Sequence, residues 1–397
     1  MSLSSLQPTK RAAGVPPFHV MRILARAKAL EAAGGDLIHM EVGEPDFPTP
    51  EPVLAAARKA LSVQPMGYTP AAGLPQLRHA IAHYYGRRYG VDLDPARVIV
   101  TPGGSGALQL ALAALVDVGD RVLTTDPGYP CNRQMVSLVG GRCVSVPVVA
   151  DDGYQLQMGQ VEEHWGGGIR ALMLASPANP TGAVASREAL SALCAYTHER
   201  HAALIVDEIY QGLTYNVEDH SALSCSEDNV FVVNSFSKYF GMTGWRLGWL
   251  VAPRQFVPIL ERLAQNLYLA APTLAQHAAL AAFSPKTLAL LDQRRDTLHE
   301  RRDLLLAALR RIGFEIPSTP DGAFYIYAAI PADLGRAAQL AEQLLEHAQV
   351  AVTPGLDFGS GRADRMLRFA YTADAERLSE AARRIRRFVG AKRNERC

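Results

Sequence analysis

Seven short apolar runs, separated mostly by helical patterns, constrain the fold of this chain more than any other feature. The runs are VIVT (98–101), RVLTT (121–125), CVSVPV (143–148), IRALMLA (169–175), ALIVD (203–207), VFVVN (230–234) and LGWLVA (247–252). Short apolar runs are typical of strands buried on both faces, and strands that alternate with helices are typical of a parallel sheet. The pattern therefore predicts an α/β fold with a mostly parallel seven-stranded sheet sandwiched by helices.

The last two runs lie too close together for another parallel crossover. Only about a dozen residues separate VFVVN from LGWLVA, whereas a parallel connection needs about a dozen or more and usually includes a helix. We therefore expect LGWLVA to run antiparallel to its neighbours.

The two ends of the chain predict a second, smaller unit. From about residue 286 the pattern changes to helix, strands and helix, and the N-terminal segment predicts an arm followed by a helix. We expect both ends to form one smaller α+β domain beside the large sheet domain. The predicted boundaries are 1–45 for the arm and helix packing on the small domain, 46–285 for the large domain and 286–397 for the small domain.

Composition is informative for what it excludes. The net charge is +1 and no long basic run occurs, which disfavours nucleic acid and membrane surfaces as partners. The five cysteines are odd in number and form no CxxC pair, which argues against a disulfide framework and a zinc site. The N-terminus lacks the apolar core of a signal peptide, and no apolar run reaches the roughly 20 residues that span a bilayer. We expect a cytoplasmic protein that needs no metal.

Polar residues follow directly after four of the apolar runs. PGGSGAL follows VIVT, SPANPTG follows IRALMLA, EIY follows Asp207, and SFSK follows VFVVN. Ligands of open α/β sheets bind outside the carboxyl ends of the strands. Four strand ends with polar side chains therefore predict one shared site.

The individual groups each have a structural alternative. The glycines of GGSGAL (103–108) suit an ordinary strand-to-helix turn or a phosphate site on helix N–H groups. Asp207 suits a helix cap or ion pair, or a carboxylate that holds a cationic ligand. Asn179 suits a turn or a donor to a ligand oxygen, and Tyr210 alone suggests a core aromatic.

Three cationic residues raise the same question. Arg246 and Arg368 lie beside apolar residues, where the planar guanidinium can form an internal ion pair or bind a phosphate or carboxylate. Lys238 follows an apolar run and is either a residue on a surface turn or a chemical reagent. The residues by themselves leave these alternatives open.

Taken together, the motifs resemble those of the class I/II (aspartate aminotransferase-like) aminotransferases, a family of fold-type I pyridoxal-phosphate enzymes. The matching stretches occur in family order between residues 43 and 371 and are GEPDF, YTPAAGLPQLR, TPGGSGAL, DPGYP, NPTG, VDEIY, SFSKYFGMTGWRLGW and LRFAY. The resemblance thus covers most of the chain, and SFSKYFGMTGWRLGW is its most specific element.

The resemblance implies catalytic roles at the cofactor ring. Lys238 would form the Schiff base with pyridoxal 5′-phosphate and then move the proton at the substrate Cα. Asp207 would keep the pyridine nitrogen protonated. Asn179 and Tyr210 would hydrogen-bond the phenolic oxygen of the ring, and Asn179 would also contact the substrate. Tyr129 would stack on the ring.

The resemblance also implies residues for the phosphate and the substrate. The residues expected at the phosphate are Gly104, Ser105, Ser235, Ser237 and Arg246. Tyr68 would reach the phosphate of the other subunit, which implies a homodimer with shared active sites. Arg368 would bind the substrate α-carboxylate, and Gly43 lies where the family closes its N-terminal segment over the substrate.

The implied reaction is a ping-pong transfer of an α-amino group from an L-amino acid to a 2-oxo acid, such as 2-oxoglutarate or pyruvate. A β-lyase (C–S lyase), a ring-forming synthase or another fold-type I enzyme is the alternative, and a non-catalytic cofactor-sensing regulatory module is a remote one. The substrate side chain is not identified by any motif. The segment 265–280 contains no lysine or arginine, which favours neutral or broad donors. Arg133 is a candidate cation for a distal carboxylate, although a surface role is the favoured alternative.

Overall fold

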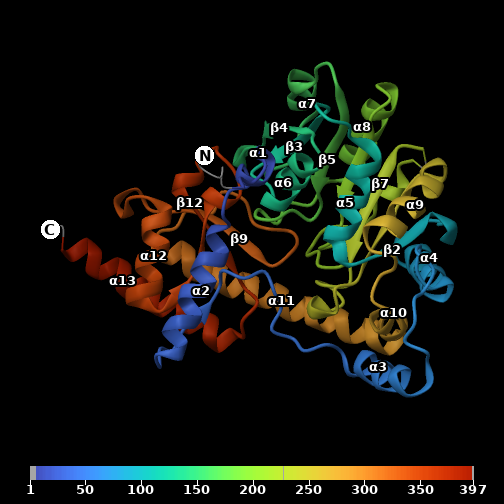
Figure 1. Ribbon diagram of the computed structural model, residues 1–397. Coiled ribbons are helices and arrows are strands. Elements are labelled where there is room, and N and C mark those ends of the chain that lie inside the picture. Colours follow the sequence, from blue (N-terminus) through green and yellow to red (C-terminus); the bar gives the residue numbers. More distant parts are fainter. Residues whose placement is uncertain (1–5, 227, 396–397) are drawn as a thin grey trace, which may run out of the picture.

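The computed structural model describes residues 6–226 and 228–395. Its central feature is a seven-stranded sheet in the order β2-β8-β7-β6-β5-β3-β4 (Figure 1). In chain order the strands are β2 (Val98–Thr101), β3 (Arg121–Asp126), β4 (Arg142–Pro147), β5 (Ile169–Ala175), β6 (Ala203–Asp207), β7 (Val230–Ser235) and β8 (Gly248–Val251). All seven predicted strands are therefore confirmed.

Strand β8 is the one that reverses direction. It pairs antiparallel with both β7 and β2, whereas β7, β6, β5, β3 and β4 pair parallel with one another. The connection from Ser235 to Gly248 holds only a short 3₁₀ turn, Thr243–Trp245, and no α-helix. The short connection therefore produces the predicted antiparallel strand.

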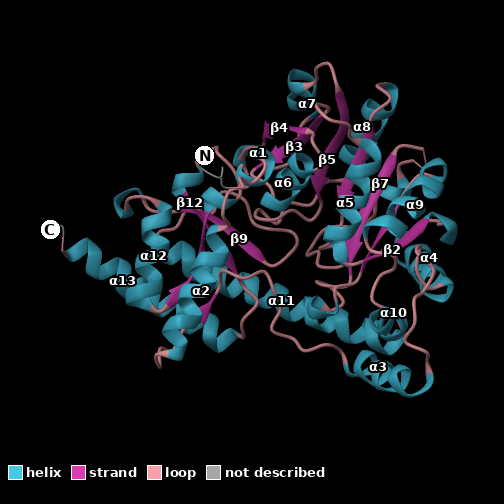
Figure 2. Ribbon diagram, viewed as in Figure 1, coloured by secondary structure: helices cyan, strands magenta, loops and turns pink. Residues whose placement is uncertain are grey.

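The sheet is apolar on both faces because successive strand residues point to opposite sides. Ile99, for example, belongs to the core under α5 (Gly103–Leu115), α6 (Pro130–Leu138) and α9 (Val257–Leu267), whereas its neighbours Val98 and Val100 belong to the opposite core. The helices of that opposite core include α4 (Pro75–Tyr89), α7 (Met158–His164) and α8 (Arg187–Glu199). Figure 2 shows the sheet in magenta with cyan helices around it.

Two smaller sheets lie beside the large one. Strands β11 (Thr353–Pro354), β12 (Met366–Ala370) and β9 (Tyr325–Ala329) form an antiparallel sheet, and β1 (Ile38–His39) pairs parallel with β10 (Val350–Ala351). Chain ends far apart in sequence thus meet in one sheet. The helices of this part are α1 (Lys10–Ala13), α2 (His19–Ala32), α12 (Ala337–Ala348) and α13 (Ala375–Asn394).

Helix α2 packs against α12, β10 and β11. The longest helix, α11 (Pro285–Ile312), begins near α10 (Thr273–Ala279) and runs to α13, beside the smaller sheets (Figure 1). Helix α3 (Glu51–Val63) packs on α10. Arg368 of β12 lines the same cavity as Ala175 and Asp207, at the carboxyl ends of β5 and β6, and Ser237, just after β7.

None of the described helices is both long enough and apolar enough to cross a membrane.

Candidate active site

A cavity of about 310 Å³ lies where the carboxyl ends of the parallel strands face β9 and β12. Most of the residues singled out from the sequence line it, although they come from seven different segments of the chain. The predicted residues that line this cavity are Gly43, Gly104, Ser105, Tyr129, Asn179, Asp207, Tyr210, Ser237, Lys238, Arg246 and Arg368.

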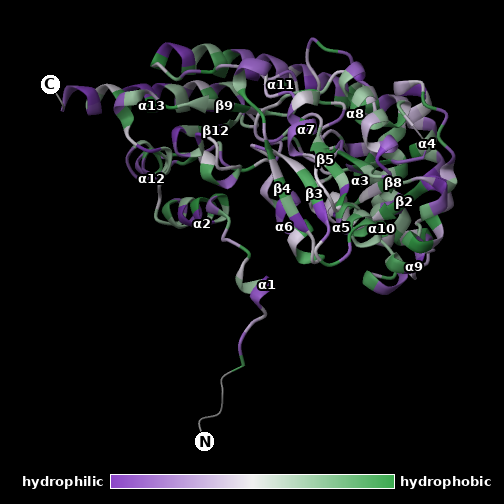
Figure 3. Ribbon diagram, turned by 90° about the horizontal axis from the view of Figure 1, so that it is seen from above, coloured by the Kyte–Doolittle hydropathy of each residue, from purple (hydrophilic) through white to green (hydrophobic). Residues whose placement is uncertain are grey.

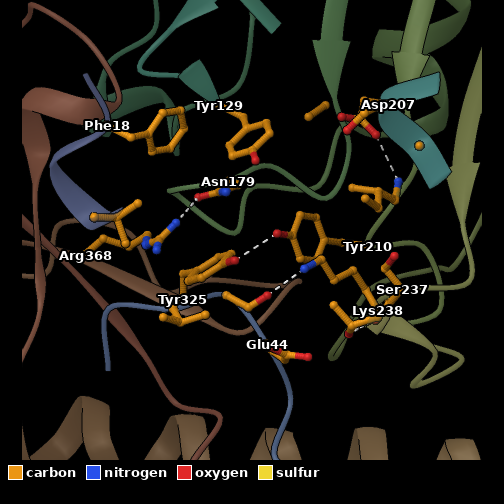
Figure 4. Close-up of a pocket in the computed structure, with 18 of the residues that line it drawn as sticks. Phe18, Glu44, Tyr129, Asn179, Asp207, Tyr210, Ser237, Lys238, Tyr325 and Arg368 are labelled. Carbon is orange, nitrogen blue, oxygen red and sulfur yellow. Dashed lines mark hydrogen bonds between the residues drawn. The ribbon is translucent and has the colours of Figure 1, made fainter. Parts of the chain in front are cut away.

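Lys238 follows β7 by three residues, and its amine lies in the cavity, where Nζ donates a hydrogen bond of 2.6 Å to the Gly43 carbonyl (Figure 4). Desolvation lowers the pKa of Lys238 to about 8, and the positive charges of Arg368 and Arg246 act in the same direction. The carboxylates of Glu44 and Asp207 oppose the shift. The environment therefore holds an unusually large neutral fraction of a normally charged amine.

Asp207 ends β6 and is buried. Its carboxylate accepts a hydrogen bond of 3.2 Å from the Ile209 N–H, and burial raises its pKa to about 6. No described lysine, arginine or histidine lies within ion-pair distance of it, so its charge lacks a direct partner. Because a buried carboxylate is stabilised by a cation, this position suits a positively charged ligand atom.

Among the described residues, Arg368 of β12 is a buried cation without an anionic partner, whereas Asp207 is a buried anion without a cationic one. Its side chain is 4 % exposed and lies 4.2 Å from the centre of the Tyr325 ring and 4.7 Å from that of Phe358. Nη1 donates to the Asn179 Oδ1 at 2.9 Å, Nη2 donates to the Glu41 carbonyl, and Nε has no partner among the described residues. A buried guanidinium without a carboxylate partner, and with a free donor, is suited to an anionic ligand.

Tyr210 and Tyr325 form a hydrogen-bonded pair, with 2.8 Å between their hydroxyl oxygens (Figure 4). Burial raises the pKa of Tyr210 well above its usual range, so its hydroxyl keeps the proton and can donate it. Tyr325 also lies against Gly43, where an added Cβ would come within 1.8 Å of the Tyr325 hydroxyl. Only a glycine, which has no Cβ, allows the Tyr325 hydroxyl to lie this close to the backbone at position 43.

The end of the cavity away from Arg368 has the features of a phosphate site. Helix α5 begins at Gly103, so the N–H groups of Gly104 and Ser105 lie in its first turn. Arg246 lines the same end, is exposed, and has no described carboxylate within ion-pair distance. Gly103 has a φ of +74°, a conformation that favours glycine, and an added Cβ there would lie 2.7 Å from the Arg246 Nη2 and force the guanidinium to shift.

Two predicted residues lie outside the cavity wall. Ser235 accepts a hydrogen bond of 3.1 Å from the Ser237 N–H and donates one of 3.1 Å to the Leu247 carbonyl, so it supports Ser237 from behind. Tyr68 lies on the loop after α3 and is 86 % exposed, away from the cavity of its own chain. Its predicted role concerns another subunit and stays a prediction.

Arg133 does not line the cavity either. Its guanidinium donates to the carbonyl oxygens of Phe358 at 2.7 Å and Asp357 at 3.3 Å. The sequence offered this residue as a candidate cation for a distal carboxylate, with a surface role as the favoured alternative, and in the structure its guanidinium is engaged by backbone carbonyls outside the cavity.

The sequence did not single out several cavity residues, among them Phe18, Glu44, Tyr325 and Phe358. Tyr325 was visible only as part of the apolar run GAFYIYAAI, whose register against β12 is a property of the tertiary structure. Phe18 precedes the first long helix, and nothing in the local pattern connects it with residues more than 100 positions away.

The fold and this cavity define an α/β protein in which a lysine amine lies in one cavity with two arginines that have no carboxylate partner among the described residues, an arrangement suited to an enzyme that binds an anionic ligand. The profile of the family described as aminotransferase class I and II matches residues 35–385. The chain is 39% identical over 374 residues to a valine–pyruvate aminotransferase of Mycobacterium tuberculosis, covering 94% of this chain and 96% of the relative. It is 35% identical to an aspartate/prephenate aminotransferase of Thermus thermophilus, with 96% and 98% of the two chains covered.

Solved structures of aminotransferases also have the same fold as this chain. A crystal structure of an aminotransferase from Mycobacterium tuberculosis superposes with a TM-score of 0.93 at 38% identity, covering 98% of this chain and all of that one. Aspartate aminotransferase from Thermus thermophilus with maleate has a TM-score of 0.91 at 34% identity, covering 96% of this chain and 100% of that one. The chain therefore belongs to the class I and II aminotransferases.

Members of this family are pyridoxal-phosphate enzymes, and the chain is a pyridoxal-phosphate-dependent aminotransferase. The cavity fits this cofactor in three respects. The unpaired Arg246 and the start of α5 suit its phosphate, the unpaired Asp207 suits its protonated ring nitrogen, and the Lys238 amine suits its aldehyde.

Proposed function

We propose that this aminotransferase transfers the α-amino group of an L-amino acid to a 2-oxo acid, such as 2-oxoglutarate or pyruvate, in a ping-pong reaction. The observation that carries the proposal is the position of the Lys238 amine. It lies in one cavity with a buried carboxylate, Asp207, and a buried guanidinium, Arg368, neither of which has an oppositely charged side chain beside it among the described residues. Two unpaired charges of opposite sign suit a cationic ring and an anionic substrate.

When bound, pyridoxal phosphate supplies a ring that withdraws electrons from the substrate Cα. We propose that Lys238 holds the cofactor and moves the proton at that carbon, since its lowered pKa suits both the acceptance and the return of a proton. Asp207 would pair with the ring nitrogen. Asn179 and Tyr210 would donate hydrogen bonds to the phenolic oxygen, and Tyr129 would lie against the ring.

The remaining roles concern the two anionic groups. Arg246, Ser237 and the N–H groups of Gly104 and Ser105 would bind the phosphate, with Ser235 positioning Ser237. Arg368 would bind the substrate α-carboxylate, and the Gly43 segment would cover the substrate.

The reaction itself is tested by incubating the holoenzyme with a panel of L-amino acids and no 2-oxo acid. A transaminase converts its cofactor to the pyridoxamine form, with a loss of visible absorbance, and releases one equivalent of 2-oxo acid. Release of pyruvate and ammonia over many turnovers would instead indicate a β-lyase. A cofactor that remains unchanged with every amino acid would contradict the proposed function.

The pKa of Lys238 predicts a pH dependence for the uptake of the cofactor by the apoprotein. Because that pKa is lowered to about 8, the neutral amine should increase about tenfold between pH 7 and pH 9 and change little above that. The rate of appearance of visible absorbance after mixing should follow the same curve. A rate that keeps rising toward pH 10.5, as for an ordinary lysine, would show that the amine is not desolvated.

We also propose a homodimer with shared sites. Apolar side chains are exposed on two adjoining segments. The segments are joined by hydrogen bonds from the Thr273 hydroxyl to the Gly67 carbonyl and from the Gln276 amide to the Thr69 hydroxyl. The exposed apolar residues are Leu61, Val63, Met66, Tyr68, Leu267 and Leu269. Residues 6–17 are also exposed and extend from the body of the chain (Figure 3). A sedimentation mass equal to one chain would contradict the dimer.

Two further assignments are proposals. The separate sheets support a division into residues 1–45, 46–285 and 286–397, with the first segment packing on the last. Limited proteolysis that cuts far from residues 45 and 285 would contradict it.

The four described cysteines are free thiols, which is typical of a reducing compartment and supports a cytoplasmic location. Fractionation of cells that express the protein would test this.

A further inference from the structure

One wall of the cavity is apolar and comes from the N-terminal segment. The cavity is lined by Phe18, Val20, Met21 and Leu24, which lie at and just after the start of α2, and by Phe358, which follows β11 in the chain. Figure 4 shows Phe18 and Arg368 on the side of the cavity opposite Asp207 and Ser237. This wall is therefore separate from the end that suits the phosphate.

The apolar wall is held in place by specific contacts. The Asp357 carboxylate accepts hydrogen bonds from the backbone N–H groups of His19 at 2.9 Å and Val20 at 2.8 Å, at the first turn of α2. The Phe18 ring packs edge-on against Tyr129, with 6.3 Å between ring centres. A negative charge on the N-terminal N–H groups of a helix stabilises it, so the wall is a built part of the cavity.

The charged residues that line the cavity leave no cation for this wall. Among the described lining residues the cations are Lys238, Arg246 and Arg368. Their proposed partners are, in that order, the cofactor aldehyde, the cofactor phosphate and the substrate α-carboxylate. The lining carboxylates are Asp207 and Glu44, and Glu44 lies close enough to Lys238 to influence its pKa. A second carboxylate on a substrate would therefore meet apolar side chains and the negative charge of Glu44.

The exposed apolar segments proposed above for the dimer contact do not supply such a cation either. Residues 60–77 and 265–280, which contain the exposed apolar side chains, have no lysine or arginine. Arg133, the remaining candidate, is engaged with the carbonyl oxygens of Phe358 and Asp357.

We propose that this aminotransferase takes L-amino acids with uncharged apolar side chains and discriminates against aspartate and glutamate. Because both half-reactions use the same cavity, the proposal also favours pyruvate over 2-oxoglutarate as the amino acceptor. The inference rests on the proposed transamination and adds the class of the substrate. An apolar side chain gains from leaving water at the wall, whereas an unpaired carboxylate loses its hydration there. The expected ratio of kcat/KM for leucine, methionine or phenylalanine over aspartate is at least about 100-fold.

The test is the half-reaction of the holoenzyme in single turnover, with each amino acid alone and the visible absorbance as the signal. Faster conversion by the apolar amino acids than by aspartate and glutamate is expected. Equal or faster conversion by aspartate overturns the substrate class but leaves the transaminase proposal intact. No conversion by any amino acid contradicts the transaminase proposal itself, so the two failures are distinguishable.

A charge placed on the wall provides a second test. Met21 is 59 % exposed, so a charged side chain at this position stays in contact with water, and Met21→Arg should raise the aspartate-to-leucine ratio of kcat/KM about tenfold or more. Ala29→Arg, which adds the same charge to an exposed position two turns further along α2, is the matched control and should leave the ratio unchanged. An equal change in both variants, or none in Met21→Arg, would contradict the proposal.

Binding without turnover provides a measurement that does not depend on any variant. Titration calorimetry of the wild-type holoenzyme with 4-methylpentanoate and with succinate compares an apolar and an anionic group on the same carboxylate. Tighter binding of 4-methylpentanoate is expected, and equal or tighter binding of succinate would overturn the proposed apolar subsite.

Discussion

Replacement of Lys238 by alanine should lower the rate of transamination at least about 10⁴-fold, because it removes both the amine that holds the cofactor and the group that moves the proton at the substrate Cα. No other described lysine lines the cavity, so no neighbouring amine is placed to substitute. The measurement is the single-turnover rate with an excess of a good amino donor.

The control for this variant is Lys28→Ala, which removes an exposed lysine of α2 that does not line the cavity and should leave the rate unchanged. Borohydride reduction of the wild-type holoenzyme, followed by peptide mass spectrometry, should locate the cofactor on Lys238. A label on a different lysine, or a Lys238→Ala variant with near-normal rate, would contradict the assignment.

The second large effect is expected for Arg368→Ala. Loss of a buried guanidinium that binds a carboxylate costs about 2–5 kcal/mol, so kcat/KM for the amino donor should fall by a factor of about 30 to 5,000. The phosphate and ring contacts lie elsewhere in the cavity, and the variant should therefore still bind the cofactor and show its visible absorbance. Steady-state kinetics and cofactor titration on the same preparation separate the two effects.

Two further variants make this result specific. Arg368→Lys keeps a positive charge but loses the planar fork, so an intermediate kcat/KM is expected. Arg362→Ala removes an exposed arginine that does not line the cavity and should have little effect. Unchanged kinetics in Arg368→Ala would show that another group binds the substrate carboxylate.

The strands of the large sheet could be predicted because their signal is local. An apolar run such as ALIVD is buried on both faces wherever the sheet places it, and β6 therefore spans the predicted residues 203–207. The reversal of β8 was also predictable, because it follows from the length of one connection. Strand order is different in kind, because β2 lies beside β8 at the sheet edge through contacts between residues about 150 positions apart.

The cavity follows the same division. The residues at the strand ends, such as Asp207 and Lys238, could be expected to lie together, because parallel strands bring their carboxyl ends to one edge. Their assigned chemical roles stay predictions until the variants are measured. Phe18, Tyr325 and Phe358 could not be anticipated, since they reach the cavity from three segments outside the large sheet.

The sequence by itself therefore determined the α/β class, the family, and the positions of Lys238 and of the polar groups around it at the strand ends, because each of these depends on short motifs or on the ends of individual strands. Only the tertiary structure decided which charges remain unpaired and what surrounds the space beside Arg368. These properties depend on long-range packing, such as Asp357 holding the start of α2 more than 330 residues away. For that reason the apolar wall, and with it the proposed substrate class, becomes visible only when the chain is folded.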